Sequence, residues 1–393
     1  MSDRIARAAL SRLSEPGDLR LRGVVAELGA ARVFDLLREE HDVRGVYTDV
    51  AERLRGLDPE RQLQEAAEHG IRLVCPGDAE WPLQLADLDF AGPVNDRGGE
   101  PLGLWVKGPL NLAEVVSNAA AVVGSRSATT YGADLAGQLA ACLVEAGTAV
   151  VSGAAFGIDV AAHRGALAAR GPTVAVLACG VDRAYPAAHQ SLLDYVAKTG
   201  LVVSELPPGC APTRLRFLSR NRVIAALGQG TVVVEAAIRS GALNTAHWAG
   251  RLGRVVMGVP GPVTSAPSGG VHELIRTGEA QLVTAGEHVL ELLAPVGQRL
   301  AATPRAGEQP TDRLETSTRQ VLDAVPVSRP AETRSIARAA GLSTAVTATA
   351  LVTLQQARIV ERHDQGWRRS TGQAIRAPQP LTGESAGGAG PAA

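Results

Sequence analysis

Six short apolar segments between residues 119 and 259 constrain the fold of this chain more than any other feature. They lie at 119–123, 149–152, 173–178, 201–205, 231–235 and 255–259. Each is apolar almost without interruption, which is typical of parallel strands that are covered on both faces. Helical patterns separate them, at 132–146, 158–169, 187–198, 220–227 and 242–252. The alternation predicts a doubly wound α/β fold with a binding site at the carboxyl ends of its strands.

Composition narrows the classes of protein that are possible. The chain has 393 residues, which suggests two or three domains, and its 39 basic and 40 acidic residues give a net charge of −1. No apolar run approaches the roughly 20 residues of a membrane span. Only Lys107 and Lys198 are lysines, and neither lies in a phosphate loop of the Walker type, which excludes a P-loop ATPase.

The N-terminal residues and the cysteines indicate a cytoplasmic protein. The first residues contain no apolar segment of the kind that a secretory signal needs. The four cysteines are widely spaced, without a Cys-x-x-Cys pair: Cys75, Cys142, Cys179 and Cys210. We interpret them as thiols rather than as disulfides or zinc ligands, and we expect neither a metal nor a cofactor.

The segments that flank the α/β region differ from it in pattern. Residues 1 to about 70 repeat apolar positions at intervals of three and four, notably over 19–40, which predicts helices. A short strand is expected at 102–106. Residues 294–314 have the composition of a linker, and 315–372 show the order helix, helix, helix and strand pair of a winged helix. The Gly/Ala/Pro-rich end, residues 373–393, is expected to be disordered.

Glycine-containing polar loops follow three of the predicted strands, and such loops let an anion approach the backbone. The first contains Gly124, Ser125 and Arg126, and the second contains Ser152 and Gly153 and continues to Gly157 and Asp159. The third runs over residues 180–186. Taken singly, each is explained as well by an ordinary turn with a capped helix. Three such loops at one sheet edge favour a binding site.

The most basic stretch is residues 211–260, with seven arginines and one acidic residue, Glu235. Within it, residues 214–222 contain a single aromatic residue, Phe217, among Arg214, Arg216, Arg220, Asn221 and Arg222. Arginines that grip phosphates around a ring that stacks on a base are typical of proteins that bind single strands. The alternative is that Phe217 anchors a loop and the arginines form a solvated face. We expect the loop to precede a helix at 220–227, whose amides would add to the anion site.

The sequence contains no clear arrangement of residues typical of an enzyme active site. Glu235, at a strand end, is a candidate carboxylate, although holding a backbone amide or an arginine is the more economical role. The histidines at 163, 189, 247 and 272 form no ligand cluster, and no nucleophile with a partnered base is evident.

The chain resembles the DNA-processing protein A (DprA, or Smf) family. The matching motifs, in order, are Gly124-Ser-Arg126, Ser152-Gly-x-Ala-x-Gly157-Ile-Asp159-x-x-Ala-His163, Gly180-x-Asp182-x-x-Tyr185-Pro186, Ser204-Glu205, Phe217-x-x-Arg220-Asn221-Arg222, Val-Val-Glu235-Ala, Ser240-Gly241-x-Leu-x-Thr245-Ala246 and Val259-Pro260-Gly261. They cover residues 119–293, and Asp78-x-x-Trp81-Pro82 extends them upstream. Each motif is unspecific alone, whereas the ordered set is specific.

The resemblance implies five segments: a helical domain at 1–75 of the SAM or helix-hairpin-helix type, an extended Rossmann-like DNA-binding domain at 76–293, a linker at 294–314, a winged helix at 315–372 and a tail at 373–393. It implies a non-catalytic, cytoplasmic mediator that protects incoming single-stranded DNA and loads the recombinase RecA in natural transformation. It also implies a homodimer formed through the Rossmann-like domain. Carried onto this chain, the DNA contacts are Arg126, Arg214, Phe217, Arg220 and Arg222, in a pocket shaped by Gly124, Ser125, Ser152, Gly153 and Asn221.

Two alternatives remain open at this point. The segment Gly228-Gln229-Gly230-Thr231 with Glu235 partly resembles the signature of phosphoribohydrolases that act on nucleotides, which would make the chain an enzyme. Alternatively, the winged helix makes the DNA contact, because arginines occur at 334, 338, 358, 362, 368 and 369.

Overall fold

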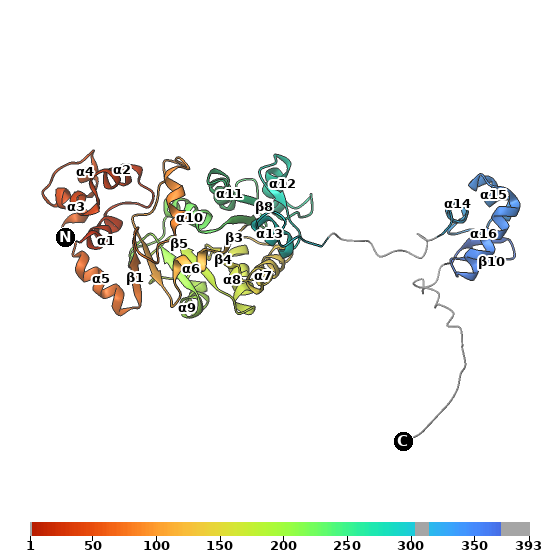
Figure 1. Ribbon diagram of the computed structural model, residues 1–393, viewed down its shortest axis with the longest axis horizontal. Coiled ribbons are helices and arrows are strands. Elements are labelled where there is room, and N and C mark those ends of the chain that lie inside the picture. The colour runs from red at the N-terminus through yellow and green to blue at the C-terminus, as the bar shows by residue number, and fades with distance from the viewer. Residues whose placement is uncertain (1, 303–313, 371–393) are drawn as a thin grey trace, which may run out of the picture. The chain divides into compact units, whose positions relative to one another are not determined.

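A computed structural model describes residues 2–302 and 314–370 of the chain, which form two compact units (Figure 1). The first unit ends at Ala301, and the second contains the described residues from 314 onward. The expected boundary at 75/76 lies inside the first unit. Most of the expected linker and all of the expected tail lie outside the described residues.

The first unit is built on a nine-stranded sheet with the order β1-β2-β6-β5-β4-β3-β7-β8-β9. All neighbouring strands from β6 to β9 in this order pair in parallel, and only β2 runs in the opposite direction, between β1 and β6, so the predicted mostly parallel α/β fold is confirmed. Their bounds are β1 Ile71–Val74, β2 Leu104–Lys107, β3 Ala119–Val123, β4 Ala149–Ser152, β5 Thr173–Leu177, β6 Leu201–Ser204, β7 Gly230–Val233, β8 Val255–Gly258 and β9 Gln281–Leu282. All six predicted parallel strands are present within two residues.

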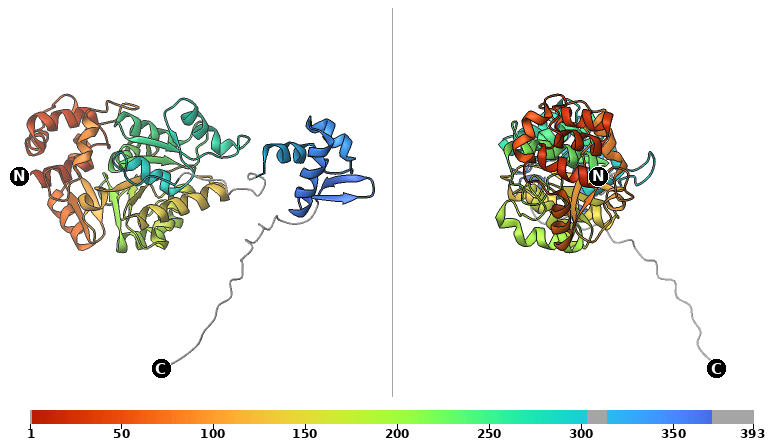
Figure 2. Two further views of the ribbon diagram at one scale, coloured as in Figure 1. Left: turned by 45° about the vertical axis from the view of Figure 1, so that its right-hand side comes forward. Right: turned by 90° about the vertical axis from the view of Figure 1, so that its left-hand side faces the viewer.

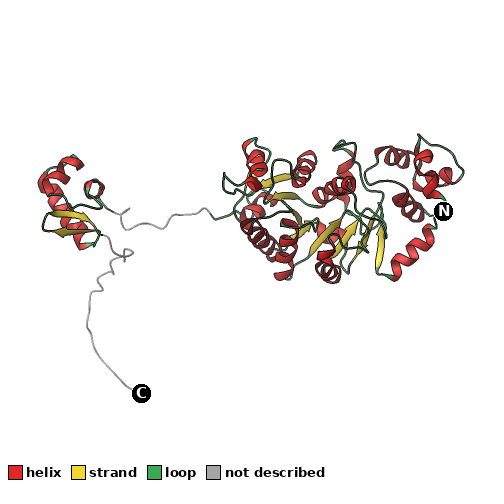
Figure 3. Ribbon diagram, turned by 180° about the vertical axis from the view of Figure 1, so that it is seen from behind, coloured by secondary structure: helices red, strands yellow, loops and turns green. Residues whose placement is uncertain are grey.

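Helices cover both faces of the sheet, as its uninterrupted apolar strands require (Figure 3). One face carries η1 (Leu83–Asp89), α6 (Leu112–Val116), α10 (Arg214–Leu227), α11 (Gly241–Arg251) and α12 (Gly269–Arg276). The other carries α7 (Thr130–Glu145), α8 (Ile158–Ala168), α9 (Gln190–Thr199) and α13 (Gly286–Leu293). Two short 3₁₀ turns complete the unit, η2 (Ala187–His189) and η3 (Ala266–Ser268).

Five helices at the N-terminus lie at the end of this unit that carries β1 and β2 (Figures 1 and 2). They are α1 (Asp3–Leu13), α2 (Leu19–Leu28), α3 (Ala30–Arg38), α4 (Val46–Leu54) and α5 (Pro59–Glu68). The Asp18 carboxylate caps α2 through the amides of Arg20 and Leu21. The apolar pattern over 19–40 is divided between two helices, because Gly29 has a φ of 80° and ends the first.

The second unit has the winged-helix order that the sequence predicts. Its helices are α14 (Thr316–Ala324), α15 (Thr333–Ala340) and α16 (Thr344–Gln356), followed by the hairpin of β10 (Val360–His363) and β11 (Gly366–Arg369). Its core includes Val321, Ile336, Leu351 and Trp367. Among the described residues of both units, no single helix is long and apolar enough to cross a membrane.

One predicted element is wrong in a way that matters for the site. Helix α10 begins at Arg214, six residues before the expected start, because the Thr213 hydroxyl accepts the amide of Arg216 and caps the helix. The segment that carries Phe217 is therefore the first turns of a helix and not a loop. Strands β1 and β9, which no pattern predicted, are an antiparallel edge strand and a two-residue edge strand.

Candidate nucleic-acid interface

The candidate site lies where the order of the sheet reverses, between β3 and β7. From β3 the chain adds β4, β5 and β6 on one side and then returns to place β7 on the other. The loops that leave β3 and β7 diverge here, which opens a crevice at the carboxyl ends of the strands. The amide of Ser125 donates to the carbonyl of Glu235 at 2.6 Å, and the amide of Ile158 donates to the carbonyl of Ser125 at 3.2 Å. The predicted loops therefore meet at one edge.

A cleft of about 890 Å³ occupies this crevice. Its charged lining is predominantly cationic, since the described lining residues include four arginines and one acid, Asp159. The lining residues fall into groups from separate parts of the chain: Asn95; Val123, Gly124, Ser125, Arg126 and Ser127; Ala155, Asp159 and Tyr185; Pro212, Thr213, Arg214, Phe217, Leu218, Arg220, Asn221 and Ile224; and Ala237, Arg239, Ser240, Gly241, Ala242, Asn244 and Thr245.

At the centre of the cleft, the exposed Arg126 lies over the half-buried ring of Phe217. The guanidinium carbon is 4.7 Å from the ring centroid, which is cation–π distance. The ring of Tyr185 lies 5.6 Å from the same ring, at an interplanar angle of 52°. Residues from three segments thus form one aromatic and cationic cluster, in which the two predicted site residues Arg126 and Phe217 are in contact.

Arg220 lies beneath this cluster and is almost wholly buried. Its Nη1 donates to the carbonyl of Val176 at 2.7 Å, and its guanidinium carbon is 5.8 Å from the Phe217 centroid. A side chain at position 153 would overlap the Arg220 guanidinium, which explains the glycine there. Burial lowers the pKa of Arg220 to about 10, with Asp159 opposing this shift, so the cation persists at neutral pH.

Asp159 is the buried countercharge of Arg220. Its carboxylate accepts the amide of Ala155 at 3.3 Å, as expected of a carboxylate in the first turn of a helix. Burial raises the pKa of Asp159, while Arg220 acts in the opposite direction. At this edge of the sheet, the buried Asp159 carboxylate therefore partly offsets the positive charge of the buried Arg220.

The structure does not bring every predicted site residue to the surface of the cleft. Ser152 is buried, and its hydroxyl donates to the carbonyl of Val122 at 2.6 Å. Asn221 lines the cleft, but its amide is engaged with Asn244 at 3.2 Å. Arg222 is fully buried and lies outside the cleft, where its two terminal nitrogens grip both oxygens of Glu205 at 2.6 and 2.7 Å. As folded here, Arg222 has no surface to offer a phosphate.

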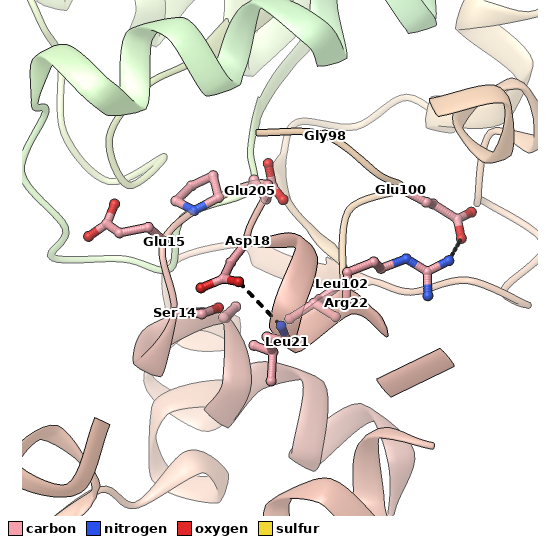
Figure 4. A pocket seen from close by; sticks show the side chains of 12 residues that line it. Ser14, Glu15, Asp18, Leu21, Arg22, Gly98, Glu100, Leu102 and Glu205 are labelled. Carbon is pink, nitrogen blue, oxygen red and sulfur yellow. Dashed lines mark hydrogen bonds and ion pairs between the residues drawn. The ribbon is translucent and has the colours of Figure 1, made fainter. Parts of the chain in front are cut away.

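The charge count over 211–260 is also misleading, because carboxylates from distant segments neutralise several of its arginines. Arg216 makes a bidentate pair with Glu15, and Arg254 pairs with Asp87 at 2.7 Å. Figure 4 shows Glu15 and Glu205 at the rim of a small cavity of about 20 Å³ between α1, α2 and the sheet. The cationic surface of this stretch is therefore smaller than the sequence indicates, and part of it, at Arg214 and Arg239, lies in the cleft.

Sequence reasoning missed some lining residues. Arg239 is exposed and reaches the cleft from the loop after β7, and Asn95 reaches it from the connection before β2. Tyr185 belongs to the third polar loop, and its place after a predicted strand was the signal that would have found it. Nothing local in the sequence marks Asn95, because its proximity depends on how η1 and the turn after it pack.

The residues that suggested an enzyme lie at opposite ends of β7. Gly228 to Thr231 lie at the amino end of β7, the edge of the sheet opposite the cleft. Glu235 is buried at the other end, where it accepts the amide of Thr129 at 2.9 Å. It holds a backbone amide, as the more economical interpretation predicted. The glycines and the glutamate therefore do not form one site.

The arginines of the winged helix are partly engaged within their own unit. Arg368 pairs with Glu361 at 2.6 Å, and Arg362 lies over the ring of Trp367 at 5.6 Å. Helix α16 carries no charged side chain. Its face therefore has no cation with which to grip a duplex, although DNA contact by the rest of this unit stays an alternative.

Comparison with known proteins assigns the chain that carries this cleft to a family. The family model for DNA recombination-mediator protein A matches residues 72–294, which contain the sheet and the cleft. The putative DNA processing protein DprA of Mycobacterium tuberculosis is 44% identical over 380 residues, which cover 94% of this chain and 95% of that protein. The chain belongs to the DNA recombination-mediator protein A family. The crystal structure of DprA from Streptococcus pneumoniae superposes with a TM-score of 0.60 and 31% identity, covering 74% of this chain and 97% of that one.

Within this DprA-family chain, we predict that Arg222 stabilises the fold and does not contact DNA. Substituting Arg222→Met leaves the Glu205 carboxylate buried without its partner, which costs about 3–5 kcal/mol of unfolding free energy. The double variant Arg222→Met/Glu205→Leu removes the stranded charge and should recover much of this loss. Urea unfolding at pH 7 measures both. If Arg222→Met were as stable as the wild type, the prediction would be contradicted. Arg276→Met is the control: it removes an exposed ion pair with Glu273 and should change the unfolding free energy little.

The DprA-family core should also lose stability in acid through His163. Burial and the nearby Arg220 lower the pKa of His163 to about 3 from 6.5, so the folded state holds it neutral. The unfolded chain binds a proton at about pH 6.5, so the contribution of His163 is complete above that pH. It is lost as the pH falls towards 3, by at most about 5 kcal/mol.

Unfolding free energies of the wild type and His163→Gln between pH 8 and 4 test this. Glutamine retains a partner for the Thr173 hydroxyl, which lies 2.7 Å from Nδ1, but does not titrate. The difference in unfolding free energy between the two proteins should shrink as the pH falls. Because both proteins contain Asp159, its titration cancels in this difference, and the change is due to His163. Parallel stability curves would refute the prediction.

Proposed function

We propose that this chain binds single-stranded DNA in the cleft and acts without catalysing a covalent reaction. The observation that carries the proposal is the contact between Arg126 and Phe217, inside a cleft whose charged lining is mainly arginine. A guanidinium binds a phosphate, and an aromatic ring beside it stacks on a base without regard to its identity. Both halves of a nucleotide thus find a partner within one site.

The position of Phe217 favours a single strand over a duplex. Its ring is half-buried on the wall of the cleft, beneath Arg126 and beside Tyr185. A base in a duplex is already stacked between its neighbours and presents only its edges in the grooves. A single strand can turn a base inward and stack it on the ring while the arginines hold its phosphates.

Phosphate contact is assigned to the arginines that reach the cleft surface, and the buried ones support them. Arg126, Arg214 and Arg239 are exposed at the cleft. Arg220 supplies charge from below through the space left by Gly153. Gly124 and Ser125 allow the backbone to approach the strand, and the first turn of α10 directs its amides towards the cleft.

We further propose that the bound strand is protected and handed to RecA during natural transformation or DNA uptake. The family to which the chain belongs supports this proposal, because its description is that of a DNA recombination mediator. It requires no cofactor and a cytoplasmic location, where RecA and incoming DNA meet. A homodimer formed through the Rossmann-like domain would present two clefts to one strand, which raises avidity.

The binding proposal predicts the behaviour of two variants. Phe217→Ala should weaken binding of an oligothymidine by about 1–3 kcal/mol, the value of one stacked base. Arg126→Ala should weaken binding and also lower the slope of log affinity against log salt by about 0.7, the value of one single-strand phosphate. Arg61→Ala, an exposed arginine on α5, is the matched control and should bind as the wild type does. Fluorescence anisotropy over a salt series measures the affinities of all four proteins. Unchanged affinity in both cleft variants would refute the assignment of Arg126 and Phe217 as DNA contacts.

The mediator proposal predicts that the chain accelerates RecA assembly. On single strands coated with a single-strand-binding protein, the wild type should shorten the lag before RecA hydrolyses ATP. Arg126→Ala should restore the lag, because strand capture precedes the handover. The same lag with and without the wild-type chain would refute RecA loading while leaving DNA binding intact.

A further inference from the structure

A second aromatic ring, Phe156, stands at the same edge of the sheet. It lies in the loop between β4 and α8, and 48% of its surface is exposed. A phenylalanine of the core would be buried, as Phe34 is at 2%. Phe156 therefore contributes much less to the stability of the fold than its size allows, and the exposed part of its ring is open to a ligand.

The loop that carries Phe156 packs directly against the backbone of Arg126. Gly157 has a φ of 77°, and a side chain there would overlap the carbonyl oxygen of Ser125 and press on that of Arg126. The residue on the other side of Phe156, Ala155, lines the cleft. Arg126 thus touches the Phe217 ring with its guanidinium, while its backbone lies against the residue next to Phe156.

The Phe156 ring is held in place from within. His189 is buried, its Nδ1 lies 2.9 Å from the carbonyl of Ala154, and its ring contacts Phe156 with centroids 4.6 Å apart at 70°. This contact is edge-to-face rather than stacked. An ordered and half-exposed ring binds a planar partner at a lower entropic cost than a mobile one.

We propose that Phe156 is a second stacking platform, which holds another base of the strand whose phosphates Arg126 grips. This inference rests on the proposed binding of single-stranded DNA in the cleft. The continuity between the Phe156 loop and the Arg126 loop places the platform on the path of that strand, and the adjacent arginine matches the charge of a nucleic acid. The strand then runs from Phe217, past Arg126, towards the loop after β4.

A tryptophan at this position would report the contact directly. The four native tryptophans, Trp81, Trp105, Trp248 and Trp367, are at most 7% exposed, so their emission should respond little to DNA. In Phe156→Trp, saturation with an oligothymidine should quench the added emission by stacking. Tyr195→Trp, at an exposed aromatic position on α9, is the control and should not be quenched.

The second part of the test compares the affinities of Phe156 variants and the wild type for single-stranded DNA. Phe156→Ala should weaken binding of a long oligothymidine about 5- to 150-fold, the range for one stacked base. Phe156→Leu retains apolar packing against His189 without a π-face and should also weaken binding. Tyr195→Ala should bind as the wild type does. Thermal unfolding of each variant identifies any that fail to fold, in which case Phe156→Leu and the quenching measurement decide.

The outcomes separate this inference from the function on which it rests. If the wild type does not bind single-stranded DNA, the proposed function fails and the platform with it. If the wild type binds and Arg126→Ala weakens binding, but Phe156→Ala and Phe156→Leu bind normally, only the platform is overturned. Weakened binding without quenching of Phe156→Trp also overturns it, because the loss then comes from a disturbed loop.

Discussion

The burial of arginines along α10 is the constraint on which the rest of the structure depends. A guanidinium taken out of water is tolerated only where fixed partners replace its hydration. Arg222 meets Glu205 after β6, Arg216 meets Glu15 between α1 and α2, and Arg220 meets the carbonyl of Val176 in β5. Each partner comes from a different segment, so α10 joins the N-terminal helices to the sheet.

This arrangement positions the cleft as well as the helix. With its other face fixed by ion pairs, α10 presents Arg214 and Phe217 to the crevice between β3 and β7. The Arg126 side chain lies over the Phe217 ring, which restricts the freedom of both groups. Under the proposed function, a base and a phosphate would meet groups whose conformational freedom has already been reduced during folding, so less entropy would be lost on binding.

The sequence predicted the sheet well because its strands carry the signal locally. Segments such as Ala119–Val123 are apolar throughout, which is the pattern of a short strand that is buried on both faces of a sheet. Strand β9 has two exposed residues and therefore no apolar pattern. The start of α10 was missed because its first turns face a polar cleft, so the apolar repeat that marks a helix begins only at Val223.

The sequence predicts only some of the residues that line the cleft, and burial explains which predicted residues lie elsewhere. Gly124, Ser125, Arg126 and Phe217 were found because glycines and polar residues after buried strands must lie at the carboxyl edge. The arginine cluster and the family motif both predict Arg222 as a DNA contact, whereas the structure buries its side chain against Glu205, outside the cleft. On a helix, neighbouring residues point about 100° apart, so the arginines at 214, 220 and 222 serve an open surface, a buried cation site and an ion pair. Carboxylates and backbone carbonyls of other segments decide which arginines remain available. A local charge count therefore overstates a nucleic-acid surface wherever a basic helix crosses the core.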